Sequence, residues 1–340
     1  MSASAERFLQ RVWYGRHAPW FSLALLPFSW LFRCIVALRR LAYRAGVFSS
    51  VRVARPVIVI GNITVGGTGK TPFTIWLANE LSGQGVQVGI ALRGYGGSSA
   101  RWPRDVDAGT SPEEVGDEAV LLAQRTAAIV VAAPDRVAAA RRAIERGAQI
   151  VLCDDGLQHY RLVRDREIVV IDGRRGVGNR RMLPAGPLRE PVSRLTQSDL
   201  RVVSWRDGSV RPLTPAPATI QACARLSQAS ALVGGETRAL DAFKGTRVHA
   251  VAAIGNPQQF FAALQELGIE VAPHALPDHA QLSADDIRFP DQLAVLMTEK
   301  DAVKCRALAD HRHWAVRMDV IVSEQDAATV HAMLDRLITA

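Results

Sequence analysis

Short apolar runs alternate with amphipathic segments over most of the chain from Val57 onward. The runs are rich in β-branched residues and apolar on both faces, as is typical of parallel strands covered by helices on each side. Between them lie helical segments, one of which closes at Gly147. The pattern predicts a doubly wound α/β domain with strands at 57–60, 86–92, 127–133, 148–155 and 167–172.

The alternation restarts at Arg247 and predicts a second, smaller α/β unit. Residues 173–220 have a weaker pattern and six prolines, so we expect an active-site loop followed by a linker there. The expected organisation is an N-terminal membrane-associated helical segment (1–50), a larger α/β domain (51–220), a linker region (221–246) and a smaller C-terminal α/β domain (247–340).

The segment from Ala18 to Leu38 is apolar on every side of a helical wheel except at Arg33. A full membrane span needs about 20 apolar residues, so this stretch is borderline. Trp20 and Trp30 suit headgroup depth, and the arginines that follow predict a cytoplasmic domain. A cleaved signal peptide is the alternative, disfavoured by the arginine-rich flank. The pattern leaves open whether the helix spans the bilayer or is partly embedded.

The net charge of +8 is confined to this N-terminal region, because residues 1–55 hold nine arginines and one acid, and the remaining charges balance. Balanced soluble domains argue against a nucleic-acid partner. The four cysteines lack metal-ligand or disulfide-like spacing and fit a reducing compartment.

A glycine-rich loop joins the first expected strand to the first expected helix of the α/β unit. Backbone N–H groups in such a loop, at a helix N-terminus, favour phosphate. We expect Lys70 to reach the β- and γ-phosphates of ATP and the Thr71 hydroxyl to hold Mg²⁺. The strict P-loop pattern is broken at its first position, and a turn without a ligand is the alternative. The expected nucleotide-binding residues are Thr64, Val65, Gly66, Gly67, Thr68, Gly69, Lys70 and Thr71.

Lysine is rare in this chain: only four of the 41 basic residues are lysines, namely Lys70, Lys244, Lys300 and Lys304. Lysine differs from arginine where a compact point charge is needed. Lys70 is therefore a candidate for a position that arginine does not fill.

Three acidic sites are candidates for chemistry. Asp154 and Asp155 end an expected strand, where a P-loop protein places the carboxylate that holds Mg²⁺ or its water. Asp117 and Glu118 begin a helix, where capping is the alternative role. His279 follows Asp278 in a loop of the second unit, where a solvated histidine is an equally good interpretation.

The motifs of this chain resemble those of the tetraacyldisaccharide 4'-kinase family of lipid A biosynthesis. They occur in the family's order as GNITVGGTGKTP, RGYGG, GDE, DDGLQH, LPAGPLRE, GNPQQFF, PDH and MTEKDAVK. The resemblance implies transfer of the γ-phosphoryl group of ATP to the 4'-hydroxyl of a tetraacylated glucosamine disaccharide 1-phosphate. It also implies Mg²⁺, a cleft between two α/β domains, and a location at the cytoplasmic face of the inner membrane.

Carried onto matching positions, the resemblance implies that Asp117 is the catalytic base, paired with His279. Thr71, Asp154 and Asp155 would organise Mg²⁺, with Glu118 in the same acidic set. Ala280 and Gln281 depart from the family's usual residues after PDH. The residues implied to line the acceptor side are Arg93, Tyr95, His159, Arg189 and Glu190.

Two rival functions share some of these features. A partitioning-type P-loop switch usually has lysine at the head of the GGTGKT core, where this chain has Val65. A nucleic-acid ATPase needs soluble domains with a positive net charge, whereas the basic and acidic residues after residue 55 balance.

Overall fold

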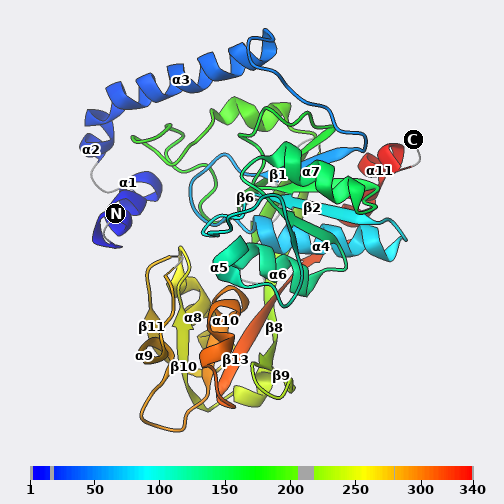
Figure 1. Ribbon diagram of the computed structural model, residues 1–340. Helices are drawn as coiled ribbons and strands as arrows, with labels where there is room; N and C mark the ends of the chain where they lie inside the picture. Colours follow the sequence, from blue (N-terminus) through cyan, green and yellow to red (C-terminus); the bar gives the residue numbers. More distant parts are fainter. Residues whose placement is uncertain (1–2, 16–18, 206–217, 279, 339–340) are drawn as a thin grey trace.

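The structure is a computed structural model that describes residues 3–15, 19–205, 218–278 and 280–338. Its strands form one sheet in the order β11-β10-β12-β13-β8-β7-β6-β1-β5-β2-β4-β3, with β9 paired to β8. Figure 1 shows that this sheet belongs to two lobes joined by the long strands β8 (Thr219–Ala231) and β13 (His313–Val322).

The large lobe is built on parallel strands, with one antiparallel strand at the edge. All residues of β1, β2 and β5 are buried, which explains why each appears in the sequence as an unbroken apolar run. The strands of this lobe are β1 (Val57–Gly61), β2 (Val88–Leu92), β3 (Arg104–Val106), β4 (Ile129–Ala132), β5 (Ile150–Asp154), β6 (Arg166–Asp172) and β7 (Leu200–Trp205).

Helices cover both faces of this part of the sheet, as a doubly wound fold requires. One hydrophobic cluster lies between the strands and α4, α6 and α11. A second cluster lies on the opposite face, under α7 and the chain from 157 to 195. The elements are α4 (Lys70–Gly83), α5 (Pro112–Val115), α6 (Asp117–Arg125), α7 (Arg136–Glu145), the 3-10 helix η1 (Val192–Gln197) and α11 (Glu324–Ile338).

The small lobe repeats this arrangement with parallel pairs of β10 with β11 and β12, and of β12 with β13. Phe260, Phe261 and Leu264 of α8 cover one face, and Ile287 and Cys305 of α9 and α10 contribute to the cluster on the other. The elements are β9 (Thr237–Ala239), η2 (Leu240–Phe243), β10 (Arg247–Ala252), α8 (Pro257–Glu266), β11 (Glu270–Ala275), α9 (Ala284–Ile287), β12 (Val295–Thr298), α10 (Glu299–Cys305) and η3 (Arg306–Leu308). The two lobes confirm the expected fold class.

Strands β8 and β13 form an antiparallel ribbon that connects the lobes. The start of β8 pairs with β7 of the large lobe, and its end pairs with β9 of the small lobe. Most of the expected linker 221–246 is therefore ordered strand. Val330 and Leu334 of α11 pack in the first cluster of the large lobe, so the chain returns there after the small lobe. The division of the chain into domains stays a prediction.

Residues 173–220 contain one more strand than the sequence predicted, because β7 pairs in parallel with both β6 and β8. This strand was not predicted because prolines flank it on both sides in the sequence. Proline disfavours a strand only at positions inside it, and Leu200–Trp205 contains none.

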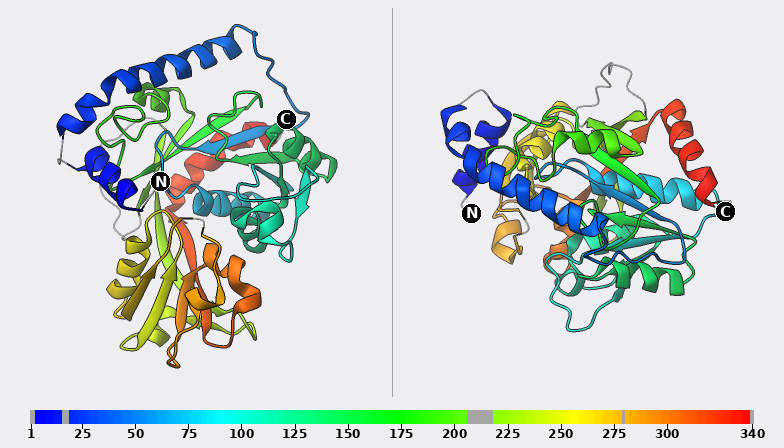
Figure 2. Two further views of the ribbon diagram at one scale, coloured as in Figure 1. Left: turned by 60° about the vertical axis from the view of Figure 1, so that its left-hand side comes forward. Right: turned by 90° about the horizontal axis from the view of Figure 1, so that it is seen from above.

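The N-terminal segment differs from the continuous apolar helix expected over 18–38. Its elements are α1 (Ala3–Tyr14), α2 (Pro19–Ala24) and α3 (Leu26–Arg44). A turn at Leu25 separates α2 from α3, and Pro27, which lacks a backbone N–H, lies in the first turn of α3. Within the described residues, none of the helices combines the length and the apolar character that a membrane crossing requires. Figure 2 shows α3 lying along the outside of the large lobe.

The packing of α11 predicts that the C-terminal helix stabilises the large lobe. Leu334 is fully buried, so Leu334→Ala should lower the free energy of unfolding by about 2–5 kcal/mol. The control is Arg336→Ala, two residues further along α11 at an exposed position. It should change the free energy of unfolding by less than about 0.5 kcal/mol. Urea unfolding followed by circular dichroism measures both. Equal midpoints for Leu334→Ala and the parent protein would contradict this packing.

Candidate active site

The glycine loop runs from the end of β1 to the start of α4. Gly66 and Gly69 adopt φ values of +92° and +90°, which side chains other than glycine rarely accept. The loop is held from outside, because Val65 N–H donates to Pro187 O (2.9 Å) and Thr64 bridges to Leu188. The hydroxyl of Thr68 is buried without a hydrogen-bond partner among the described residues. A loop of this form presents backbone donors to a bound anion.

Asp154 and Asp155 lie at the end of β5, beside this loop. Asp154 is buried and accepts hydrogen bonds from the hydroxyls of Thr71 and Thr74, each at 3.3 Å. Asp155 turns away to the basic side chains, with its Oδ1 3.5 Å from Lys70 Nζ and 3.2 Å from Arg189 Nη2. The two neighbouring carboxylates therefore have different partners.

Because their partners differ, the pKa values of the Asp154 and Asp155 carboxyl groups also differ. Burial raises the pKa of Asp154 to about 6, and the charge of Glu118 adds to the effect. Burial acts in the same direction on Asp155, but Lys70 and Arg189 outweigh it and lower the pKa of that carboxyl to about 2. Asp155 is therefore ionised at neutral pH. A positive charge added beside Asp154 would lower the raised pKa of that carboxyl group.

Asp117 and Glu118 begin α6 and face α10 of the small lobe. Asp117 is buried, and its Oδ1 accepts the N–H of Glu118 (2.8 Å), so part of the expected capping role is present. Lys300 Nζ lies 3.0 Å from Glu118 and 4.0 Å from Asp117 Oδ2, and Lys304 Nζ lies 3.9 Å from the same oxygen. Burial alone would lower the pKa of Lys300, but Glu118, Asp117 and Asp278 raise it.

Arg125 at the end of α6 fixes the same contact between lobes. Its guanidinium pairs with Glu299 at the start of α10, and with Asp319 of β13 at 2.6 Å. Arg125 is almost fully buried, where a paired charge is costly to separate. The lobes therefore meet through α6 and α10.

A cavity of about 410 Å³ opens between the lobes over the glycine loop. Residues 65–72, Asp154 and Asp155 line it, together with Lys300 from the small lobe. Apolar side chains also line it, among them Ile75, Leu121, Leu226, Ile254, Phe260, Val316 and Met318.

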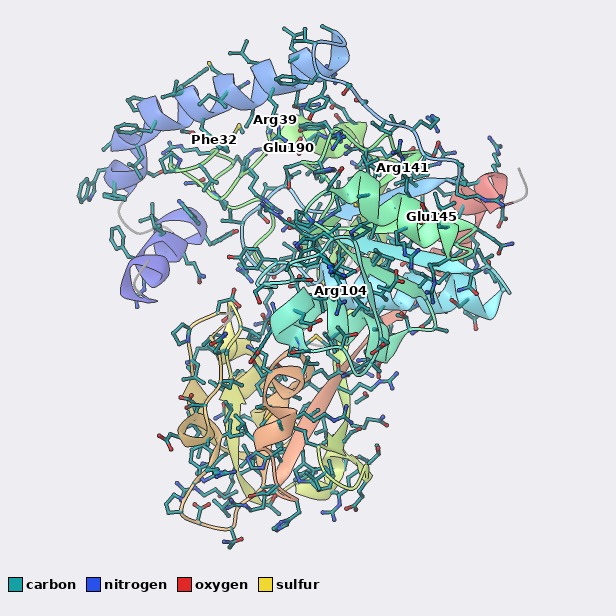
Figure 3. All side chains as sticks on the ribbon, viewed as in Figure 1. Phe32, Arg39, Arg104, Arg141, Glu145 and Glu190 are labelled. Carbon is teal, nitrogen blue, oxygen red and sulfur yellow. The ribbon has the colours of Figure 1, made fainter. Side chains whose placement is uncertain are left out.

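A second cavity, of about 990 Å³, lies between the large lobe and α3. Phe32, Ile35 and Val36 of α3 give it one apolar wall. Figure 3 shows Phe32 and Arg39 on α3 close to the segment that carries Glu190. All five residues expected on the acceptor side line this cavity, namely Arg93, Tyr95, His159, Arg189 and Glu190.

These five side chains differ in their surroundings. Tyr95 is 61% exposed, and Arg93 is exposed as well. Burial lowers the pKa of His159 to about 4, helped by Arg136, so the ring is neutral at pH 7. Glu190 is fully buried and accepts a hydrogen bond from Gln158 Nε2 at 3.1 Å, which makes it a support for the wall.

The two cavities meet at one place. The residues that line both are Gly66, Glu118, Asp154, Asp155, Arg189 and Asp278. A group held in one cavity can therefore reach a group held in the other next to these acids. Asp278 precedes His279, which lies outside the described residues.

The side chains around Thr71 fit a magnesium ion that takes most of its ligands from a substrate. The Thr71 hydroxyl and the buried Asp154 carboxylate lie 3.3 Å apart, and Mg²⁺ is usually held by one or two carboxylates plus phosphates and water. Asp155 and Glu118 are engaged by Lys70 and Lys300 instead. Among the described residues, no cluster of three or more histidine, cysteine or acidic side chains forms an all-protein metal site.

Several side chains that shape the site were not predicted from the sequence. Arg136 is buried and donates to Asp154 O (3.1 Å), and Arg175 donates to Gly67 O (3.1 Å). Lys300 and Lys304 could have been found, because the count of four lysines already singled them out beside Lys70. The arginines carry no such signal in a chain with 37 of them.

Comparisons with known proteins agree on one family. Residues 21–339 match the family model described as LpxK, tetraacyldisaccharide-1-P 4'-kinase. A tetraacyldisaccharide 4'-kinase from Stenotrophomonas maltophilia is 47% identical, covering 96% of this chain and 95% of the relative. One from Alkalilimnicola ehrlichii is 45% identical, with 97% of both chains covered. A crystal structure of LpxK from Aquifex aeolicus in complex with ATP superposes with a TM-score of 0.79, at 28% identity, over 94% of this chain and 99% of that one.

The conformation of the glycine loop generates a prediction about stability. A Cβ at residue 69 would lie 2.6 Å from Ser204 Oγ, and φ there is positive, so Gly69→Ala should destabilise the protein by about 1–3 kcal/mol. Gly83→Ala is the matched control, because a Cβ there meets nothing within 4 Å at the end of α4. It should be neutral or stabilise by up to about 1 kcal/mol. Denaturant unfolding compares the two, and equal stabilities would show that the loop geometry is not required.

Proposed function

The chain belongs to the tetraacyldisaccharide-1-P 4'-kinase family, and from this premise we propose that it transfers the γ-phosphoryl group of ATP to the 4'-hydroxyl of a tetraacylated disaccharide 1-phosphate, a precursor of lipid A. Members of this family are phosphotransferases. The observation that carries the proposal for this chain is the meeting of the two cavities at shared acidic and basic residues. That geometry suits the transfer of a group from one bound substrate to another.

The smaller cavity supports ATP as the donor. The loop amides and Lys70 form a positive cradle for the triphosphate, and the apolar side chains that line the same cavity suit the adenine ring. The ATP in the LpxK structure from Aquifex aeolicus supports the same assignment. Residues 64–71 are thus proposed to bind the nucleotide.

Thr71 and Asp154 are the residues proposed to hold Mg²⁺, with Asp155 and Glu118 nearby. When bound there, the ion would neutralise negative charge on the phosphates of ATP. Lys70, Arg136 and Arg189 keep the acidic end of β5 in charge balance around it.

Asp117 is proposed as the base for the acceptor hydroxyl, with His279 as its partner. Lys300 Nζ and Lys304 Nζ lie 4.0 and 3.9 Å from Asp117 Oδ2, so two cations of the small lobe face this carboxylate. The 4'-oxygen forms a bond to the γ-phosphorus while its proton passes to the Asp117 carboxylate. The bond between that phosphorus and the bridging oxygen breaks, and ADP leaves with the electron pair.

The larger cavity is proposed to hold the lipid acceptor. Its apolar α3 wall suits acyl chains, and Arg93, Tyr95, His159 and Arg189 offer polar contacts to a sugar phosphate. Trp20, Phe28, Trp30, Leu31, Leu38 and Leu41 are exposed on α2 and α3. Such a surface, flanked by arginines that each gain roughly 1 kcal/mol near anionic lipid, supports docking at the cytoplasmic face of the inner membrane.

The proposal predicts the product of one reaction. Purified protein incubated with γ-labelled ATP, Mg²⁺ and the tetraacyldisaccharide 1-phosphate in anionic vesicles should transfer label to the lipid and sediment with the vesicles. Label should appear at the 4' position, which mass spectrometry of the product determines. Label in water-soluble phosphate alone would overturn the assignment.

Lys70→Arg tests the donor site in the same assay. A planar guanidinium should not replace the point charge at the β- and γ-phosphates, so turnover should fall by roughly 10²-fold or more. Lys244→Arg, on the surface of the small lobe, should keep full activity. Normal turnover in the Lys70 variant would remove Lys70 from the mechanism.

The proposed pair of Asp117 and His279 predicts a non-additive loss. Either Asp117→Ala or His279→Ala should lower kcat by about 10²–10⁴-fold, the usual contribution of a general base. The double variant should be little worse than the more damaging single one, because the two act as a unit. The measurement is kcat at saturating ATP and lipid. Fully multiplicative losses would mean that the residues act independently.

A further inference from the structure

Arg175 lies against the glycine loop, on the side opposite the acids of β5. Its Nη2 donates to Gly67 O at 3.1 Å, and its Nη1 lies 3.6 Å from where a Cβ of Gly66 would be. It lines the smaller cavity together with residues 65–72. A guanidinium has five N–H donors, so Arg175 has more donors than its contacts with Gly67 O and Asp172 use.

The sheet order explains this position. Strand β1, which leads into the loop, lies between β5 and β6. Asp155 follows β5 and holds Lys70, whereas Asp172 ends β6 and holds Arg175, with Asp172 Oδ2 3.4 Å from Nε. The loop is therefore flanked by two cations, each anchored by an acid at the end of a neighbouring strand.

Arg175 is held rigidly for an arginine that lines a cavity. The buried Asp172 also accepts the backbone N–H groups of Arg174 and Arg175, at 3.0 and 2.9 Å. The ring of Tyr14, at the end of α1, lies 5.6 Å from the guanidinium carbon, in cation–π range. Burial raises the pKa of the Tyr14 phenol, and the groups around it are Arg175, Asp172 and Thr64 of the loop.

The end of α1 is itself fixed to the large lobe. Trp13 O accepts the N–H of Asn179 (2.9 Å), and Trp13 Nε1 donates to Pro184 O (3.0 Å). Gly178 is required beneath it, because a Cβ there would lie 2.8 Å from Trp13 O, at φ +59°. Tyr14 therefore reaches Arg175 only when α1 is seated on this segment.

We propose that Arg175 is a further catalytic residue, which contacts the triphosphate at the outer end of the loop, and that Tyr14 is a positioning residue that holds its guanidinium. The inference rests on the proposed function, since it needs the triphosphate in this loop. Its guanidinium stabilises the negative charge that develops on the γ-phosphoryl oxygens. An arginine in this role is worth about 10³–10⁵-fold in kcat in related phosphoryl transfers.

The test compares Arg175→Ala and Arg175→Lys with Arg174→Ala, which removes the same charge from the exposed neighbouring residue. We expect kcat to fall by about 10³-fold in Arg175→Ala and to recover by less than tenfold in Arg175→Lys. Arg174→Ala should stay within about threefold of the parent. Affinity for ADP, measured by calorimetry, should change by less than about threefold, because ADP lacks the outer phosphate.

A purely supporting role for Arg175 gives a different result. If it only held the Gly67 carbonyl, Arg175→Ala would weaken ADP and ATP binding equally and lower the melting temperature, and this result overturns the proposal. Near-normal kcat in Arg175→Ala, with Lys70→Arg inactive, overturns this inference alone. Near-normal kcat in both variants would overturn the proposed use of the loop itself.

Tyr14 is tested through its dependence on Arg175. Tyr14→Leu should lower kcat by roughly 2- to 30-fold, the range of a cation–π contact, while Tyr14→Phe keeps most of the activity. In the Arg175→Ala background, Tyr14→Leu should have no further effect on kcat. An equal loss in both backgrounds would overturn the positioning role.

Discussion

Two adjacent carboxylates at the end of a buried strand impose the main constraint on this protein. Asp154 and Asp155 bring negative charge to the carboxyl end of an internal strand, where burying a charge without partners would be costly. Thr71, Thr74 and the backbone satisfy Asp154, and Lys70 and Arg189 neutralise Asp155. These contacts connect the start of α4 and the LPAGPLRE segment to the end of β5, and Arg136 of α7 joins the same place through its hydrogen bond to Asp154 O.

The same constraint links the two cavities. Arg189 hydrogen-bonds to both Asn62 and Asp155, so the wall of the larger cavity is tied to the strand that carries the loop. Its backbone N–H donates to Ile63 O at 2.7 Å. Arg189 and Asp155, which line both cavities, therefore connect the two cavities directly. Phosphoryl transfer depends on such positioning more than on covalent chemistry by the protein.

The ribbon of β8 and β13 places the small lobe over the loop, and charged pairs between α6 and α10 fix its position. Lys300 and Glu299 come from the small lobe, whereas Glu118 and Arg125 come from the large one. The N-terminal helices act at the other end, where Ser22 and Ser29 donate to Ala185 O and Met182 O at 2.5 and 2.8 Å. The helices α2 and α3, which expose apolar side chains, are thereby attached to residues 182–185. The residues that follow, Pro187 and Leu188, contact the glycine loop.

The sequence by itself determined the features whose signal is local. The strands of the large lobe could be predicted because burial on both faces leaves a continuous apolar run, and the loop because glycines, Lys70 and Thr71 are contiguous. The family followed from motifs in a fixed order. The tertiary structure alone decided which distant charges meet, including Lys300 with Glu118 and Arg175 with the loop, and that α11 packs in the large lobe. It also divided the apolar stretch 18–38 into two helices. Periodicity reports which face of an element is buried, whereas the partner of a buried charge depends on how the chain returns, and no local pattern records that path.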